Sequence, residues 1–344
     1  VWVIGHKNPD TDSICAAICY ANLKNRLQDG FHYIPKRAGS INEETKYVLQ
    51  HFGVEPPEYA EDAGAQVKDI AFRRTAGVSG HISLKKAWEL MKTENVMTLA
   101  VTSASDKLEG LIITGDIAES YMDVYDNHIL SRARTQYKNI VETLNGTLLA
   151  GNEHAYFLRG KVVVATGSRD VIEECIESDD LVIVGDRDET HICALEENAS
   201  CMVVTGGTQV SAQVLEMANR RDCVVIITPY DTFTAARLIN QSMPIKYFMK
   251  KENFVTFDID DYVDEVREVM SKKRHRDFPV LDDQRRYLGM VSRRNLLNMH
   301  KKKLILVDHN EKSQAIDGIE GAEILEIIDH HRLGSLETMS PVFF

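Results

Sequence analysis

Val1-Trp2-Val3-Ile4-Gly5-His6-Lys7-Asn8-Pro9-Asp10-Thr11-Asp12 joins an apolar run to a turn that holds one histidine and two aspartates. The run has the length and β-branched content of a buried strand. Two later stretches repeat the form, since residues 304–307 precede Asp308-His309-Asn310-Glu311 and residues 324–328 precede Asp329-His330-His331. In a parallel sheet, these side chains would share one carboxyl edge, where open α/β sheets bind ligands. The pattern therefore predicts an α/β fold and a site assembled from both ends of the chain.

The residue types at this edge favour a metal site. Imidazole and carboxylate suit manganese, cobalt, zinc or iron, and a bridging carboxylate can hold two ions roughly 3.5 to 4 Å apart. Two such ions clamp a phosphoryl group and generate hydroxide. For Asp10 or Asp12 taken singly, a helix cap before the apolar helical run at Ile14 is an equal alternative. The metal interpretation is favoured for the whole set of His6, Asp10, Asp12, Asp308 and His330.

The 344-residue chain is acidic, with 52 Asp and Glu against 40 Lys and Arg and a formal net charge of -12. This balance argues against general affinity for nucleic acids or anionic membranes. No apolar stretch approaches the roughly 20 residues that span a bilayer, and no charged-then-apolar leader precedes the first strand. The six cysteines lack CxxC spacing and mostly lie in apolar runs, so we expect reduced core residues. These features predict a cytoplasmic protein with neither nucleic-acid nor membrane partners.

An internal repeat separates the two ends of the predicted site. Residues 81–116 align without a gap over residues 260–295, pairing Met91 with Met270 and Gly110 with Gly289. Each copy reads as an amphipathic helix, a strand, a polar turn, a second strand and a final helix. Such a repeat predicts two copies of one supersecondary unit that pack against each other.

The two copies resemble CBS domains, which carry a Gly, two apolar residues, Ser or Thr, two variable residues and Asp or Asn at a strand-to-helix turn. Such domains commonly bind adenine nucleotides between the copies. The second copy fits fully, as Gly289-Met290-Val291-Ser292-Arg293-Arg294-Asn295, whereas the first, Gly110-Leu111-Ile112-Ile113-Thr114-Gly115-Asp116, has its hydroxyl one place late. A hydroxyl and helix-start N–H groups receive phosphate, and Asn or Asp binds ribose. The resemblance implies a full nucleotide half-site and a modified one, formed by Ser292, Asn295, Arg276, Arg293, Thr114 and Asp116.

For Arg293 and Arg294, a solvated charged face remains an equal alternative to a nucleotide contact.

Between the copies, residues 128–243 alternate apolar runs with amphipathic segments, which indicates βαβ units. Thr205-Gly206-Gly207-Thr208 follows one of these runs and either holds a phosphate or forms a turn. The stretch resembles a DRTGG domain, although only the Thr-Gly-Gly part of the naming motif is present.

The segments outside residues 63–302 resemble the catalytic domain of family II inorganic pyrophosphatases of the DHH superfamily. The resemblance rests on the His6-to-Asp12 turn, on Tyr33-Ile34-Pro35-Lys36-Arg37-Ala38-Gly39, on Val307-Asp308-His309-Asn310-Glu311 and on Asp329-His330-His331. The order of modules is similar to that of the nucleotide-regulated, CBS- and DRTGG-containing members. We therefore expect an α/β fold in which a parallel-sheet DHH domain is interrupted by two α/β CBS domains flanking an α/β DRTGG-like domain. The expected boundaries are 1–62 and 303–344 for the two DHH parts, 63–127 and 244–302 for the CBS domains and 128–243 for the DRTGG-like domain.

The resemblance implies hydrolysis of inorganic pyrophosphate to two phosphates by a hydroxide that two metal ions activate. The ions would be Mn²⁺ or Co²⁺, with Mg²⁺ accompanying the substrate. His6 and Asp10 would bind one ion, and Asp12 and His330 the other. Asp308 would bridge the two ions.

The same resemblance implies catalytic roles for residues next to the metal ligands. His331 would contact substrate phosphate, and Asp329 would orient the adjacent histidines. His309 either touches the leaving group or packs beside the strand end. The family also has a second catalytic lobe with a further metal ligand and basic substrate residues. We expect this chain, which ends in Ser340-Pro341-Val342-Phe343-Phe344, to be a fragment without that lobe and poorly active alone.

Regulation is also implied by the resemblance, as inhibition by AMP and ADP, activation by ATP and binding of diadenosine polyphosphates, in a homodimer formed through the CBS domains.

Two alternative functions stay open. One is another DHH phosphoesterase, acting on oligonucleotides or cyclic dinucleotides; the run from His309-Asn310-Glu311 to Leu336-Glu337 favours pyrophosphatase over it. The other is a nucleotide sensor without catalytic activity.

Overall fold

The computed structural model describes residues 1–123, 126–167, 169–298, 301–332, 334, 336, 338 and 342–343. Of the predicted terminal stretches, Glu337, Ser340, Pro341 and Phe344 lie outside the described residues. The chain divides into two compact units. The first unit comprises Val1–Arg74, Thr256–Asp283 and Gly289–Phe344, and the second comprises Thr75–Val255 and Gln284–Leu288.

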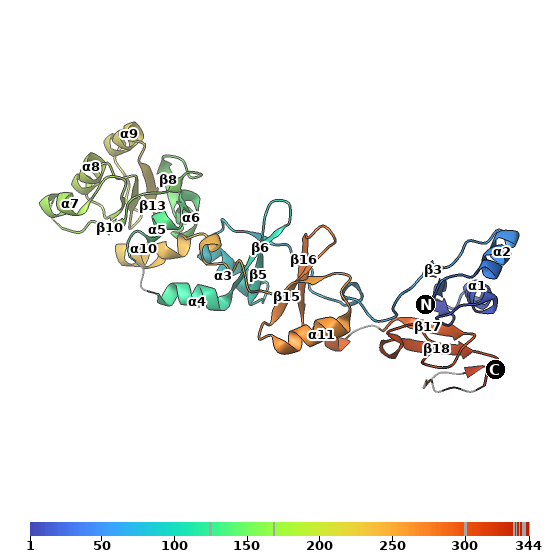
Figure 1. The fold of residues 1–344 in the computed structure, drawn as a ribbon. Helices are drawn as coiled ribbons and strands as arrows, with labels where there is room; N and C mark the ends of the chain where they lie inside the picture. The colour runs from blue at the N-terminus through green and yellow to red at the C-terminus, as the bar shows by residue number, and fades with distance from the viewer. Residues whose placement is uncertain are drawn as a thin grey trace. The chain divides into compact units, whose positions relative to one another are not determined.

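The first unit is built on a six-stranded parallel sheet to which both ends of the chain contribute (Figure 1). β1 pairs in parallel with β17, so that Val3 lies opposite Ile305, and β17 pairs in parallel with β18. The three predicted apolar runs are therefore confirmed as neighbouring parallel strands. The sheet order is β19 (Val342–Phe343), β18 (Glu323–Ile328), β17 (Lys303–Val307), β1 (Trp2–Ile4), β2 (Ile34–Arg37) and β3 (Glu58–Tyr59).

Both faces of the central strands are buried, as expected of a parallel sheet. On one face, Val3 and Ile305 pack against Ala17 and Ala21 of helix α1 (Thr11–Leu27). On the other face, strand residues pack against the segment around the 3-10 helix η5 (Ile319–Gly321), through Ile4, Leu304, Leu306, Ala315 and Ile316. Helix α2 (Glu43–Phe52) follows β2, and the 3-10 helix η1 (Val67–Asp69) follows β3.

The two repeats have the same element at each aligned position until their last element. In the second unit the first repeat holds β4 (Val78–Ser79), α3 (Leu84–Thr93), β5 (Thr98–Thr102), β6 (Leu108–Ile113) and α4 (Thr114–Met122). In the first unit the second repeat holds β14 (Phe257–Asp258), α11 (Val263–Lys272), β15 (Asp277–Leu281), β16 (Tyr287–Ser292) and η4 (Asn295–Asn298). The predicted final helix is thus confirmed in the first repeat, whereas the second has a 3-10 turn among its described residues.

The stretch between the repeats forms a five-stranded sheet in the second unit. Its order is β10 (Val162–Val164), β11 (Leu181–Val184), β12 (Cys201–Val204), β13 (Val224–Ile227) and β8 (Thr147–Ala150). The first four strands are parallel, as the βαβ pattern predicts, and β8 is antiparallel. The helices here are α5 (Ile129–Arg132), α6 (Tyr137–Thr143), α7 (Arg169–Cys175), α8 (Asp188–Glu196), α9 (Ala212–Arg220) and α10 (Thr232–Leu238). The shorter elements are β7 (Thr135–Gln136), β9 (Tyr156–Phe157), η2 (Ile239–Ser242) and η3 (Ile245–Tyr247).

One buried core runs through the first repeat and the five-stranded sheet. Met91 and Ile112 of the repeat belong to the same cluster as Ile140, Leu181 and Ile183. Disrupting either part therefore exposes apolar surface of the other. Among the described residues, none of the helices has both the length and the apolar content that crossing a bilayer requires.

The cysteines only partly match their prediction as core residues. Cys193, Cys201 and Cys223 are buried, whereas Cys19 and Cys175 are exposed. The prediction is wrong for these two because each lies on a helix, α1 or α7, at a position that faces solvent. An apolar run in the sequence therefore did not identify the buried side of these helices.

Candidate metal centre

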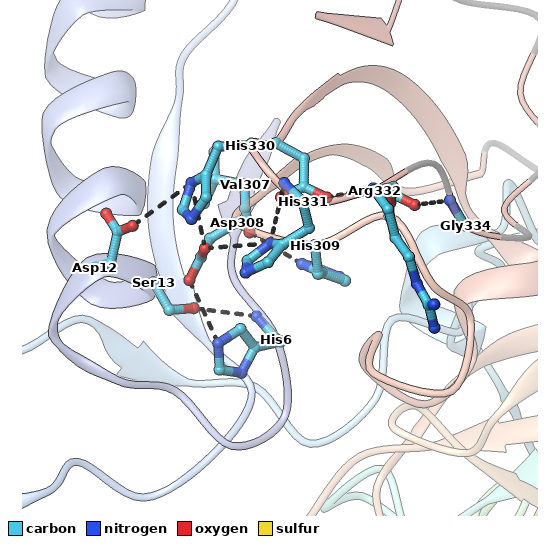
Figure 2. A network of polar contacts seen from close by, with 12 residues as sticks. His6, Asp12, Ser13, Val307, Asp308, His309, His330, His331, Arg332 and Gly334 are labelled. Atoms are coloured by element: carbon cyan, nitrogen blue, oxygen red, sulfur yellow. Dashed lines mark hydrogen bonds and ion pairs between the residues drawn. The ribbon is translucent and has the colours of Figure 1, made fainter. Parts of the chain in front are cut away.

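The ends of three neighbouring strands bring the predicted acidic and histidine residues together (Figure 2). Nε2 of His6, after β1, lies 3.3 Å from Oδ2 of Asp308, after β17. Nδ1 of His330, after β18, lies 3.9 Å from Oδ1 of Asp308 and 3.8 Å from Oδ2 of Asp12. Asp308 therefore lies between histidines contributed by the two strands that flank its own.

Asp308 is a buried member of the cluster, at 5% exposed. Its backbone adopts a left-handed conformation, with φ 61, which Asp tolerates better than most residues. Its N–H donates to the carbonyl of Ile328 at 2.9 Å, which ties the turn to β18. Burial raises the pKa of Asp308, and the nearby Asp12 and Asp10 raise it further. The ionised carboxylate is therefore held at an electrostatic cost that a bound cation would relieve.

A second group of ligand atoms surrounds Asp329. Nδ1 of His331 donates to Oδ1 of Asp329 at 2.7 Å, and the backbone N–H of His331 donates to the same oxygen at 3.1 Å. The first of these hydrogen bonds raises the pKa of His331. Burial alone would raise the pKa of Asp329, but its hydrogen bonds from His331 and Asn310 lower it overall. Asp329 is therefore placed to orient the imidazole next to it.

Both interpretations of Asp10 apply to the same side chain. Its Oδ1 accepts a hydrogen bond from the N–H of Ser13 at 3.0 Å, so Asp10 caps helix α1. It also offers a carboxylate oxygen within 4.8 Å of ligand atoms of His6 and Asp308. Because a carboxylate has two oxygens, capping one leaves the other for a ligand. Asp12 lies in the first turn of α1 and faces His330 (Figure 2).

These residues fit a divalent metal centre. Ligand atoms of Asp308, Asp329, His330 and His331 lie within 4.8 Å of one another, and those of His6, Asp10 and Asp308 form a second such group. Oδ2 of Asp308 is buried and has no hydrogen-bond partner among the described residues. A buried carboxylate oxygen is seldom left in this state, since desolvating it without a partner is unfavourable. A cation shared by the two groups would satisfy it.

Two residues that hold the ligands were not identified as site residues from the sequence. Asn310 is buried, and its amide donates to Asp329 and to the carbonyl of Arg332, the latter at 3.0 Å. Ser13 is buried too, and its Oγ accepts the N–H of His6 at 3.1 Å. A Cβ on Gly5 would lie 1.8 Å from this Oγ, which explains the glycine. The sequence signal for these roles is position, because Asn310 lies two residues after Asp308 and Ser13 directly follows Asp12.

His309 lies beneath the cluster. Its side chain is fully buried, and its Nδ1 donates to the carbonyl of Val307 at 2.9 Å. Burial lowers the pKa of His309, which favours the neutral imidazole. Its ring meets the ring of His6 edge-on, with centroids 6.3 Å apart. This position fits the packing alternative, and contact with the leaving group stays a prediction.

The predicted nucleotide residues of the second repeat are engaged in local contacts. The hydroxyl and N–H of Ser292 donate to Oδ1 of Asn295 at 2.7 and 2.8 Å, and Nδ2 of Asn295 donates to the carbonyl of Ala71 at 2.8 Å. The guanidinium of Arg293 donates to the carbonyls of Met270, Lys273 and His275. Arg293 thus satisfies carbonyls at and beyond the end of α11. Arg276 is exposed, just before β15.

Thr114 and Asp116 lie in the second unit, whereas Ser292 and Asn295 belong to the first. Thr114 lines a cavity of about 570 Å³ that also reaches Trp88 of α3. Asp116 is buried, accepts the N–H of Ile113 at 2.9 Å and lies 3.1 Å from Nζ of Lys250. Asp116 therefore stabilises the turn into α4.

The glycine pair after β12 forms a turn. The N–H of Gly206 donates to the carbonyl of Tyr230 at 2.7 Å, and that of Gly207 to the carbonyl of Thr228 at 2.8 Å. Both glycines have positive φ, 77 and 67. Because both N–H groups are already paired within the chain, the geometry supports the turn over the phosphate loop.

Comparison with known proteins identifies the modules. The DRTGG domain family model matches residues 139–242, and the CBS domain model matches residues 245–301. The crystal structure of the CBS and DRTGG domains of the regulatory region of Clostridium perfringens pyrophosphatase, complexed with the activator diadenosine tetraphosphate, is 36% identical to this chain, with a TM-score of 0.64. It covers 67% of this chain, and the match covers 100% of that structure. The protein is thus a mixed α/β chain that contains CBS and DRTGG domains.

Two relatives match along the entire chain. The "Cobalt-dependent inorganic pyrophosphatase" of Clostridium perfringens is 41% identical, and the "Probable manganese-dependent inorganic pyrophosphatase" of Thermotoga maritima is 38% identical, each over 344 residues. The chain spans 62% of the length of either relative. The chain therefore belongs to the family of inorganic pyrophosphatases that contain CBS and DRTGG domains.

Proposed function

We propose that this chain carries the metal centre of an enzyme that hydrolyses inorganic pyrophosphate to two phosphates. The names of the Clostridium perfringens and Thermotoga maritima relatives support the reaction and the choice of Mn²⁺ or Co²⁺. The shared position of the ligands at the strand ends supports the site. In this proposal, the six-stranded sheet and its helices are a DHH domain with parts 1–62 and 303–344, separated by CBS, DRTGG-like and CBS domains at 63–127, 128–243 and 244–302.

The observation that carries the proposal is the carboxylate of Asp308. Its buried Oδ2 accepts no hydrogen bond from the described residues and lies 3.3 Å from Nε2 of His6, and its Oδ1 lies 3.9 Å from Nδ1 of His330. His6 and Asp10 would hold one ion, and Asp12 and His330 the other, with Asp308 shared. Two bound ions would supply Lewis-acid polarisation of a phosphoryl oxygen and a more acidic water. Mg²⁺ would accompany the pyrophosphate.

The remaining residues of the cluster would bind and orient. The side chain of His331 is 54% exposed, and its Nδ1 is held by Asp329, so Nε2 is free to donate to a substrate phosphate. A raised pKa favours the protonated imidazolium, which suits an anionic substrate. Asp329, itself held by Asn310, would keep this orientation.

Phosphate release from pyrophosphate by the full-length protein, with Mn²⁺ or Co²⁺, tests this function. Replacing Asp308 with Asn should lower the turnover by at least about a hundredfold, because the shared ligand loses its charge. Asp260→Asn is the matched control, since Asp260 is exposed in the same unit and its carboxylate pairs with Lys68. Retained turnover in Asp308→Asn would refute the shared role. Cleavage of short oligonucleotides in preference to pyrophosphate would instead indicate another phosphoesterase.

We further propose regulation by adenine nucleotides, with AMP and ADP inhibiting and ATP activating, in a cytoplasmic homodimer formed through the CBS domains. The activator in the Clostridium perfringens structure supports an adenine-containing ligand, diadenosine polyphosphates included. Ser292 and Asn295 belong to the first unit and precede β17 and Asp308 along the chain. A shift of these residues on nucleotide binding would therefore be transmitted through the backbone to a metal ligand.

Calorimetric titration with AMP tests the regulatory proposal. Heat of binding is expected between micromolar and millimolar AMP, and Ser292→Ala should weaken the affinity about tenfold, because a hydroxyl that serves a phosphate is lost. Ser271→Ala, which removes an exposed hydroxyl on α11, should leave it unchanged. A titration with no heat over this range would count against nucleotide control.

A further inference from the structure

The second unit contains a cavity with cationic and aromatic lining residues that none of the proposed roles uses. It measures about 640 Å³. It lies where the loop before α3, the turn between α5 and β7, strand β9 and the segment around η3 meet. Its volume is within the range of pockets that hold small molecules, about 300 to 1,000 Å³.

Four cationic side chains line this cavity, from Arg132, Arg134, Lys246 and Lys251. No acidic side chain is among its described lining residues. The chain as a whole carries a formal net charge of -12, so the charge of the cavity lining is opposite in sign to that of the protein. A concave cluster of one charge concentrates ions of the opposite sign. The lining therefore selects an anion with more than one charge.

The four cations differ in whether the protein already neutralises them. Nη2 of Arg132 lies 2.7 Å from Oδ2 of Asp126, and Nζ of Lys246 lies 4.0 Å from Oε2 of Glu109. In the part of the chain that the structure describes, Arg134 and Lys251 have no ion-pair partner. Guanidinium and ammonium groups only donate hydrogen bonds, so their ligand must be rich in acceptors. Phosphate groups meet this requirement.

The backbone of Arg134 gives independent support for a role of its side chain. Its φ is 55, in the left-handed region that glycine and asparagine adopt more readily than arginine. Its N–H donates to the carbonyl of Ser131 at 3.0 Å, which fixes the turn. Arginine at this position has a conformational cost that a ligand contact by the guanidinium would offset.

Aromatic side chains complete the lining. The rings of His81 and Tyr156 meet edge-on with centroids 6.4 Å apart, and Tyr247 packs against Phe248 at 5.1 Å. Tyr156 and Tyr247 are 40% and 47% exposed. Accessible aromatic faces beside cations are suited to stacking with a planar base.

We propose that this cavity binds an oligophosphate group, with Arg134 and Lys251 as its principal contacts. The group is either a free phosphate chain or the phosphate chain of a nucleotide whose base stacks on Tyr247. The site is distinct from the half-sites around Ser292 and Thr114 and does not depend on the metal centre.

Calorimetry on the full chain in EDTA, with inorganic tripolyphosphate as the probe, tests the site. We expect saturable binding that Arg134→Gln with Lys251→Gln weakens at least about tenfold, as for the loss of a charged hydrogen bond. The control variant, Arg220→Gln with Lys92→Gln, removes the same charge from exposed positions outside the cavity and should bind as the wild type does. No binding, or equal binding by both double variants, would overturn the proposal.

A second arm separates the two sources of the phosphate chain. GTP is the nucleotide probe, because adenine nucleotides would also engage the proposed CBS sites. If the ligand is a nucleotide, GTP binds more tightly than tripolyphosphate and Tyr247→Ala weakens only GTP. If the ligand is a free chain, the two probes bind alike and Tyr247→Ala changes neither. Because EDTA removes metal ions, neither result depends on the pyrophosphatase function.

Discussion

At the scale of single residues, the candidate site depends on Asp308 and on the side chains that hold its neighbours. The sequence predicted Asp308, His6 and His330 because each belongs to a short polar cluster that follows an apolar run, and the ends of parallel strands meet. The sequence could not predict the hydrogen bonds of Asn310, which reaches Asp329 and Arg332 on a different strand end. Such contacts depend on how two turns face each other, which no local pattern encodes.

Replacing Asn310 with Ala should weaken both the fold and the metal centre. The change leaves the buried carboxylate of Asp329 and the carbonyl of Arg332 without this donor, which costs about 1 to 3 kcal/mol in the free energy of unfolding. Losing an orienting hydrogen bond should also lower the Mn²⁺ affinity by about 10- to 100-fold. Chemical denaturation and Mn²⁺ titration measure the two effects.

Asn42→Ala provides the matched control for this prediction. Asn42 caps α2 through the N–H of Thr45, so its loss should destabilise the fold by about 1 kcal/mol. The Mn²⁺ affinity should not change. Equal Mn²⁺ affinities in the two variants would show that Asn310 has only a structural role.

At the scale of elements, periodicity predicted the helices and strands of the two repeats, because their apolar spacing follows the period of each element. It did not predict the 3-10 helix η4, with which the described part of the second repeat ends, nor the use of Arg293 to satisfy carbonyls around the end of α11. Both depend on tertiary surroundings. The helix cap at Asp10 was one of two predicted roles, and its geometry permits both.

Helix α1, which carries Asp10 and Asp12 at its start, is tied to β18 by a polar network. The hydroxyl of Tyr20 donates to Oε2 of Glu326 at 2.5 Å, and Nζ of Lys24 donates to Oε1 at 2.7 Å. Burial, followed by the hydrogen bond to Glu326, raises the pKa of Tyr20 from 10.0 to about 12. The network therefore couples the position of α1 to the ionisation of a tyrosine.

This network predicts a loss of stability in alkaline solution. Since the folded-state pKa of Tyr20 is the higher one, the unfolded chain releases its proton first, and the free energy of unfolding falls as the pH rises from about 10 to about 12. Tyr20→Phe should be less stable at neutral pH and should show a smaller decline over this range. Tyr47→Phe, which removes an exposed phenol on α2, is the control. Parallel pH profiles for wild type and Tyr20→Phe would contradict the assignment.

At the scale of the whole molecule, one parallel sheet is completed by segments from opposite ends of the sequence. β1 and β2 come from the first forty residues, and β17 and β18 come from residues beyond 300. The residues between them contain both repeats and the five-stranded sheet. A metal centre formed this way requires both end segments to fold together, so its ion binding reports on the assembly of the sheet.

The number of metal ions bound by the chain tests the central claim most directly. Equilibrium dialysis against Mn²⁺ or Co²⁺, with elemental analysis, should find two ions per wild-type chain. Asp308→Asn should bind fewer than one, because both ions lose their shared ligand, while Asp260→Asn should still bind two. Two ions retained by Asp308→Asn, or no ions bound by the wild type, would contradict a two-metal centre at these strand ends.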